Sequence, residues 1–155
     1  MPGHIDARLK ELGLELPAAA APVANYVPYV ISGTLVFVSG QITLRDGKPH
    51  FLGRLGEELD TRQGYQAARL CGINIVSQLK AACGGDLDRV KRIVRLGGFV
   101  ACTPDFTDQP KVVNGASDLM VEVFGDAGRH CRSAVGAPSL PLGVSVEVEC
   151  VAEIG

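Results

Sequence analysis

Hydrophobic and polar residues alternate most regularly near the end of the chain. From residue 144 to residue 154 nearly every second position is apolar, and most positions between them are polar or acidic. A strand has this period of two because successive side chains point to opposite faces. We predict a strand whose apolar face carries Val144, Val146, Val148, Cys150, Ala152 and Ile154. The other face is expected to carry Ser145, Glu147, Glu149 and Glu153.

Two stretches carry apolar residues at the spacing of an amphipathic helix. The first is expected to begin at Asp60, because an Asp followed three residues later by Gln63 can satisfy the free N–H groups of a helix start. The second is expected to open at Asp108 and to close at Gly125. Both helices should bury one face against a sheet.

Shorter elements complete the pattern. We expect a short helix over residues 4–16 followed by a loop, a hairpin over 26–41, and surface turns with brief strands over 42–59. Further strands are expected over 90–102 and 132–136. This order predicts an α+β fold, a mixed β-sheet with two helices packed on one face. The Val-rich uncovered face would be buried most simply by oligomerisation.

Composition narrows the possible partners. A chain of 155 residues fits one domain (1–155), with residues 1–22 as an N-terminal helix and loop extension. The formal charge of −2 argues against nucleic-acid binding, and no apolar run is long enough to span a membrane. We expect a cytoplasmic protein. The five cysteines are odd in number and widely spaced, which favours reduced thiols over disulfides or a zinc site.

Known catalytic motifs narrow the chemistry further. The chain has no phosphate-binding loop, no dinucleotide fingerprint and no paired histidines, so we expect no metal site. Arg132 and Glu147 lie on predicted strands on either side of a Pro-containing turn. By spacing alone they could meet across that turn and offer a carboxylate-binding fork beside a carboxylate base. An ordinary cross-strand salt bridge is the alternative.

Several separate motifs resemble those of one known family. The tail reads Arg132-Ser133, Leu140-Pro141 and Val146-Glu147-Val148-Glu149, and the earlier part reads Tyr26-Val27, Val38-Ser39-Gly40-Gln41 and Asn114. In this order they resemble the Rid (reactive intermediate deaminase) superfamily of the YjgF type. The resemblance covers about residues 23–151 and implies a chorismate-mutase-like homotrimer with a central barrel and clefts between neighbouring subunits.

The resemblance also implies an activity. Characterised members hydrolyse 2-imino or enamine acids to 2-keto acids and ammonia without a cofactor. Carried over by motif, Arg132 would hold the substrate carboxylate and Glu147 would activate water. The cleft would be lined by Tyr26, Ser39, Gly40, Asn114 and the backbone at Ala134.

The chain departs from the family pattern at one position of the expected cleft. Many family members have Cys where this chain has Ala134, so the reactivity of that thiol is not carried over to this protein.

Two alternatives to the deaminase activity stay open. A non-catalytic trimer that binds small carboxylate or keto-acid metabolites is the first alternative. The second is an RNA-directed role, because some members carry ribonuclease or L-PSP endoribonuclease labels. The acidic composition and the scarcity of aromatic residues argue against RNA binding.

Overall fold

The strands of the computed structural model, which describes residues 3–19 and 25–155, form one main sheet and one small hairpin. The helices in these ranges are α1 (His4–Glu11), α2 (Thr61–Ala82) and α3 (Gln109–Phe124), and short 3₁₀ turns occupy Leu87–Arg89, Gly125–Gly128 and Pro141–Gly143. The strands are β1 (Tyr29–Ser32), β2 (Leu35–Ile42), β3 (Leu44–Arg45), β4 (Lys48–Pro49), β5 (Val90–Ala101), β6 (Cys131–Ala137) and β7 (Val146–Ile154).

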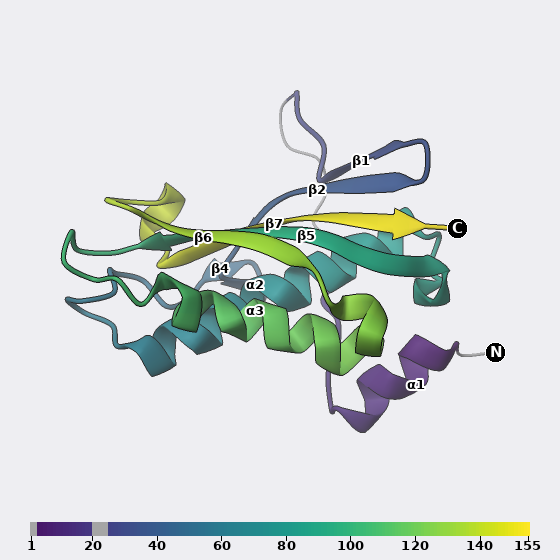
Figure 1. Cartoon of the computed structure of the whole chain (residues 1–155), viewed down its shortest axis with the longest axis horizontal. Coiled ribbons are helices and arrows are strands. Elements are labelled where there is room, and N and C mark those ends of the chain that lie inside the picture. Colours follow the sequence, from purple (N-terminus) through teal and green to yellow (C-terminus); the bar gives the residue numbers. More distant parts are fainter. Residues whose placement is uncertain (1–2, 20–24) are drawn as a thin grey trace.

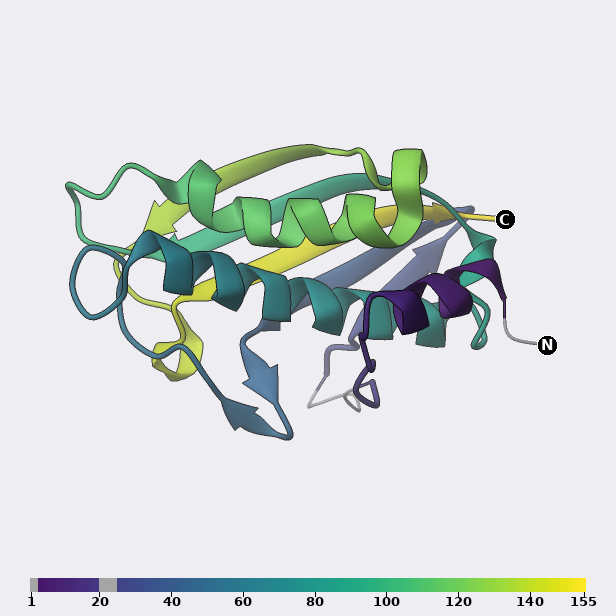
Figure 2. The ribbon, with the colours of Figure 1, turned by 90° about the horizontal axis from the view of Figure 1, so that it is seen from below.

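The main sheet has the strand order β1-β2-β7-β5-β6. Strands β5 and β6 are parallel, and the other neighbours are antiparallel. Helices α2 and α3 lie side by side across one face, and α1 lies beyond them on the same side (Figures 1 and 2). The predicted α+β fold, with a mixed sheet and two helices packed on one face, is therefore confirmed.

The core lies between the sheet and the two long helices. Val146, Val148 and Ala152 of β7 are fully buried there, together with the apolar stripes of α2 and α3. A Cβ atom at Gly115 of α3 would collide with the backbone carbonyl of Tyr65 in α2. The two helices thus approach to backbone contact, which glycine permits because it has no side chain.

The two long helices begin at the residues predicted from their capping signals, and α3 also ends at its predicted residue. The Gln63 N–H donates to Asp60 Oδ1 over 2.8 Å, and the Asp60 N–H donates to Gln63 Oε1 over 2.9 Å, so the capping box is confirmed. Helix α3 follows Asp108 as predicted, although the Asp108 side chain makes no capping hydrogen bond. Gly125 ends α3 with a φ of 62°, the left-handed conformation that glycine adopts readily.

Four boundaries or exposures differ from the sequence prediction. The N-terminal helix ends at Glu11, before Gly13, and the predicted 1–22 extension reaches positions outside the described residues. The hairpin strand begins at Tyr29, three residues after its predicted start. The last strand begins at Val146. Ser145 is buried rather than exposed, because its backbone pairs with Phe51 and Ala101.

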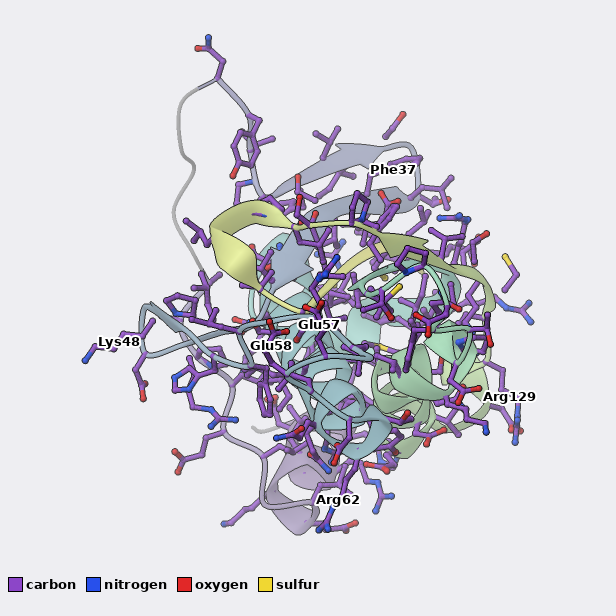
Figure 3. All side chains as sticks on the ribbon, turned by 90° about the vertical axis from the view of Figure 1, so that its left-hand side faces the viewer. Phe37, Lys48, Glu57, Glu58, Arg62 and Arg129 are labelled. Atoms are coloured by element: carbon purple, nitrogen blue, oxygen red, sulfur yellow. The ribbon has the colours of Figure 1, made fainter. Side chains whose placement is uncertain are left out.

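The segment 42–59 is not entirely a surface segment. The Leu55 side chain is 0% exposed, and the Leu55 backbone bonds to Ala101, the last residue of β5, and to Thr103 just after it. The β3–β4 hairpin extends outward, with Lys48 pointing away from the body of the molecule (Figure 3). The prediction of brief strands separated by turns is otherwise confirmed.

The sheet face opposite the helices carries exposed apolar side chains. Phe37 of β2 is 44% exposed and Val135 of β6 is 48% exposed. Phe37 lies on this open side, whereas Arg62 at the start of α2 lies on the helix side (Figure 3). Within the described residues no helix is both long and apolar enough to cross a membrane.

Candidate active site

A cavity at one edge of the sheet collects four of the predicted site residues. Tyr26, Ser39, Gly40 and Glu147 all line it, together with residues of α2 and of the loop before β7. Strand β1 pairs with only the first part of β2, so the last residues of β2 are left beside this cavity. The sequence prediction that these four residues share a cleft fits this arrangement.

A β-bulge places the Glu147 carboxyl group. The pairing of β2 with β7 shifts between Val38 and Gln41, so Ser39 and Gly40 together oppose one residue of β7. A Cβ atom at Gly40 would collide with a carboxylate oxygen of Glu147. The Glu147 side chain therefore lies directly against the backbone of the bulge, in space that only a glycine leaves free.

Burial alters the acidity of this carboxyl group. Partial burial raises the pKa of Glu147 above its ordinary value, and the charge of Glu149 on the same strand raises that pKa further. A carboxylate with a raised pKa is a stronger base at neutral pH. Glu147 is thus suited to accept a proton from water.

Arg132 lies at the other edge of the sheet, on β6. Its Nη1 group donates to Asn114 Oδ1 over 2.8 Å and to Ser117 Oγ over 3.0 Å. Its Nη2 group donates to the backbone carbonyl of Pro110 over 3.1 Å. All three acceptors belong to α3, so the guanidinium group is held against that helix. Asn114 and Arg132 therefore lie in hydrogen-bond contact, and Ala134 lies two residues further along β6.

These contacts leave donors available on the Arg132 guanidinium. Arginine has five N–H groups, and three of them are used by the acceptors on α3. Among the described residues, the Nε–H and one N–H of Nη2 have no hydrogen-bond acceptor. Two neighbouring nitrogens of a guanidinium group can bind the two oxygens of a carboxylate in parallel.

Ser117 is itself held by His130, which lies in the segment before β6. Ser117 Oγ lies 2.8 Å from His130 Nε2, and His130 Nδ1 lies 2.6 Å from the carbonyl oxygen of Gly128. Since the carbonyl can only accept, Nδ1 carries a proton, and in the neutral ring Nε2 accepts the Ser117 hydroxyl. No motif in the sequence pointed to Ser117 or His130, because no local pattern links positions 13 residues apart.

Arg132 and Glu147 do not meet within one chain, so the idea that they meet across the turn is wrong. Strand β5 lies between β6 and β7. Arg132 pairs with the buried Leu96 and contacts α3, so it points to the helix side. Glu147 alternates with the buried Val146 and Val148, so it points to the open side. The ordinary cross-strand salt bridge between them is excluded for the same reason.

The cysteine side chains are free thiols, and most of them are buried. Cys71, Cys83, Cys102 and Cys150 are buried and free, and Cys131 is exposed and free. Burial raises the pKa of Cys150 to about 12, so this thiol stays protonated at neutral pH. In residues 3–19 and 25–155 no group of three or more His, Cys, Asp or Glu side chains could hold a metal ion.

Comparison with known proteins decides the family. The model of the family described as YjgF/chorismate mutase-like, putative endoribonuclease matches residues 6–154, almost the whole chain. This protein belongs to the Rid/YjgF family. The match confirms the resemblance found in the Arg132, Leu140-Pro141 and Glu147 motifs.

Relatives of this Rid/YjgF protein match it over nearly their full lengths. Protein TCP17 of Trypanosoma cruzi is 51% identical over 153 residues, which cover 98% of this chain and 95% of that protein. The solved structure of Atu1372 from Agrobacterium tumefaciens, described as of unknown function, is 48% identical with a TM-score of 0.92, covering 97% and 92% of the two chains. A protein from Shewanella oneidensis described as a putative endoribonuclease is 41% identical with a TM-score of 0.93, covering 98% and 100%.

Proposed function

We propose that this Rid/YjgF protein hydrolyses small 2-imino and enamine acids to 2-keto acids and ammonia. Arg132 holds the substrate carboxylate, and Glu147 activates the attacking water. The observation that carries the proposal is the Arg132 guanidinium, which is fixed by three acceptors of α3 and retains unused N–H donors. A prearranged fork of this kind suits a planar carboxylate.

The proposed site is shared between two subunits of a homotrimer. Arg132 and Glu147 point to opposite sides of one sheet, so they can act on one substrate only if each comes from a different copy. The exposed Phe37 and Val135 support assembly through the open face, because burying apolar surface favours association. The central barrel of the family gives the arrangement that we propose.

The chemistry follows from these two groups. The carboxylate fork sets the position of the adjacent C=N carbon relative to bound water. Glu147 accepts a proton from water as the oxygen attacks this carbon, and the imine nitrogen is protonated. The resulting carbinolamine then loses ammonia and becomes the 2-keto acid. Tyr26, Ser39 and Gly40 would line the Glu147 side of the cleft, and Asn114 and Ala134 the Arg132 side. No cofactor takes part in this scheme.

The test is release of ammonia and keto acid from 2-aminoacrylate and from 2-imino acids generated in place by a dehydratase or an amino-acid oxidase. We expect wild type to accelerate release over the buffer rate. Arg132→Ala should lower kcat/KM by about a hundredfold or more, since a charge-assisted bidentate contact is lost together with substrate alignment. Arg132→Lys should recover only a small part of the rate, because an ammonium group has no planar fork.

Arg129→Ala provides the matched control. Arg129 is only three residues away, its side chain is 71% exposed, and it pairs with the fully exposed Asp126. Its loss should leave turnover unchanged. Equal activity of wild type and Arg132→Ala would contradict the proposed anchor.

A non-catalytic binding protein for small carboxylate or keto acids is the second candidate. It is favoured by the Arg132 fork, whose three fixing contacts are complete within one chain and do not involve Glu147. Keto-acid binding that depends on Arg132, with no ammonia release from any imine, would support this candidate over the enzyme.

Some relatives are described as putative endoribonucleases, but we do not propose that this protein cleaves RNA. The chain has a formal charge of −2, with three Tyr, five Phe and no Trp for base stacking. RNA binding that weakens steeply with added salt would contradict this choice.

A further inference from the structure

The cavity beside Glu147 is much larger than a three-carbon acid requires. Its volume is about 660 Å³. Pockets in the range of about 300 to 1,000 Å³ take up ligands of drug size. Glu147, Ser39 and Gly40 form only part of its wall, so most of the cavity lies beyond the reacting groups.

The rest of the wall is mainly apolar and comes from four separate segments. These are the N-terminal segment, the entry to the hairpin β1–β2, the β3–β4 hairpin and the loop before β7. Among the described residues, the aliphatic wall residues are Pro17, Ala18, Pro28, Leu44, Pro141 and Leu142, together with Ile42 at the end of β2. Leu142 lines the cavity and is 69% exposed, so its side chain stands at the rim.

Polar residues of α2 in this cavity serve mainly to fix its walls. The Asn74 amide donates to the carbonyls of Ile42 and Leu44 over 3.1 and 3.0 Å. The Ser77 hydroxyl donates to the carbonyl of Pro17 over 2.6 Å. Gln78 is 2% exposed, and its buried Oε1 atom has no hydrogen-bond partner among the described residues, so this wall holds one unpaired polar atom. The hydrogen bonds of Asn74 and Ser77 attach the N-terminal segment and the start of the β3–β4 hairpin, which projects past α2 (Figure 2), to the helix.

We propose that this cavity is a subsite for a bulky apolar substituent of the substrate, such as a branched aliphatic or aromatic side chain. The inference rests on the proposed function and specifies its substrate class. Of the residues that the structure describes, the one charged side chain on the wall besides Glu147 is Asp46, at the exposed turn of the β3–β4 hairpin, where solvent screens it. An apolar substituent would therefore replace water along Pro28, Leu44 and Leu142 at little polar cost.

The first test compares kcat/KM for imines that an amino-acid oxidase makes from Ala, Leu, Phe and Glu. We expect the Leu-derived and Phe-derived imines to be preferred over the Ala-derived imine by at least about tenfold, the value of a few buried carbons. The Glu-derived imine, whose side chain is charged, should gain nothing over the Ala-derived imine.

Ala18→Trp tests the position of the subsite. A Trp at this wall should fill the cavity and lower the ratio of Leu-derived to Ala-derived kcat/KM by about tenfold. Ala19→Trp is the matched control, because Ala19 is the next residue, is exposed, and does not line the cavity. It should keep the wild-type ratio.

Binding of the keto-acid products separates this proposal from the proposed function. Calorimetry should show that 4-methyl-2-oxopentanoate and phenylpyruvate bind at least about tenfold more tightly than pyruvate, and that Ala18→Trp removes this difference. Turnover without a preference for large substituents would overturn the subsite and leave the deaminase standing. If no imine is turned over but the larger keto acids still bind more tightly, the proposed deaminase is overturned and the subsite stands. Equal binding of all three acids would overturn the subsite.

Discussion

Glu147 combines two demands at one residue, since it is the base of the proposed reaction and its side chain also lies against the bulge of β2. Burial and the Glu149 charge raise the pKa of its carboxyl group, so the ionised form is less favourable in the folded state than in the unfolded state. The stability that follows from a raised carboxyl pKa is complete below the unfolded pKa and is lost as the pH rises through the folded pKa. Glu147 thus weakens the fold at neutral pH.

Glu147→Gln should therefore be slightly more stable than wild type at pH 7, while its turnover falls by about a hundredfold or more. We expect a thermal midpoint higher by on the order of a degree or two. The two proteins should become equally stable below about pH 4, where Glu is protonated in both states. Thermal unfolding across this pH range checks the sign. A lower midpoint for Glu147→Gln at pH 7 would contradict the burial penalty.

At the scale of elements, α3 and β6 act together to hold Arg132. Asn114 and Ser117 lie one turn apart on α3, and both accept from the Arg132 Nη1 group. His130, in the segment that leads into β6, holds the hydroxyl of Ser117. His130 therefore reaches Arg132 only through Ser117 and is a positioning residue in this arrangement.

Ser117→Ala should lower kcat/KM by about tenfold, because a hydrogen bond to a charged group is lost. His130→Ala should act in the same direction with a smaller effect. The double variant should match Ser117→Ala alone, because the contribution of His130 requires the Ser117 hydroxyl. Effects of the two substitutions that simply multiply would show that His130 acts by another route. Separate kcat and KM values distinguish positioning of the carboxylate from general loss of fold.

Elements with local causes could be predicted from the sequence. Asp60 and Gln63 are three residues apart and specify the start of α2 without reference to the rest of the chain. Leu55 could not be placed in the core, because its burial depends on backbone contacts with Ala101 and Thr103. The spacing of apolar residues within 42–59 contains no information about those distant partners.

The relation between Arg132 and Glu147 was mistaken for a similar reason. Nearness in sequence across the turn suggested adjacent strands, yet β5 pairs with both β6 and β7. A signal for this order was present, since a strand, a helix and a second strand in succession usually form a parallel pair. The individual residues Tyr26, Ser39, Gly40 and Asn114 came from the family motifs, and their grouping into two half-sites came from the fold.

At the scale of the whole molecule, the proposed site requires assembly, because Arg132 and Glu147 point to opposite sides of one sheet. Arg132→Ala and Glu147→Gln should each give inactive trimers of 16.3 kDa subunits. Co-expression of the two variants should restore about a quarter of the wild-type turnover, because one in four neighbour pairs then carries both intact groups if subunits mix at random.

Light scattering and two different affinity tags would verify that mixed trimers have formed. Isolated mixed trimers without turnover would contradict a site shared between subunits. Co-expression of Arg132→Ala with Arg132→Lys is the control, since no pair in those trimers contains an intact Arg132.

The contact between Gly40 and Glu147 also constrains how the family can diverge. Any side chain at position 40 would occupy the space of the Glu147 carboxylate, so the two positions are not free to vary independently. A lineage that gives up the carboxylate at position 147 is released from the need for glycine at position 40. We expect substitutions at the two positions to appear together among relatives, which would mark the branches that abandoned this chemistry.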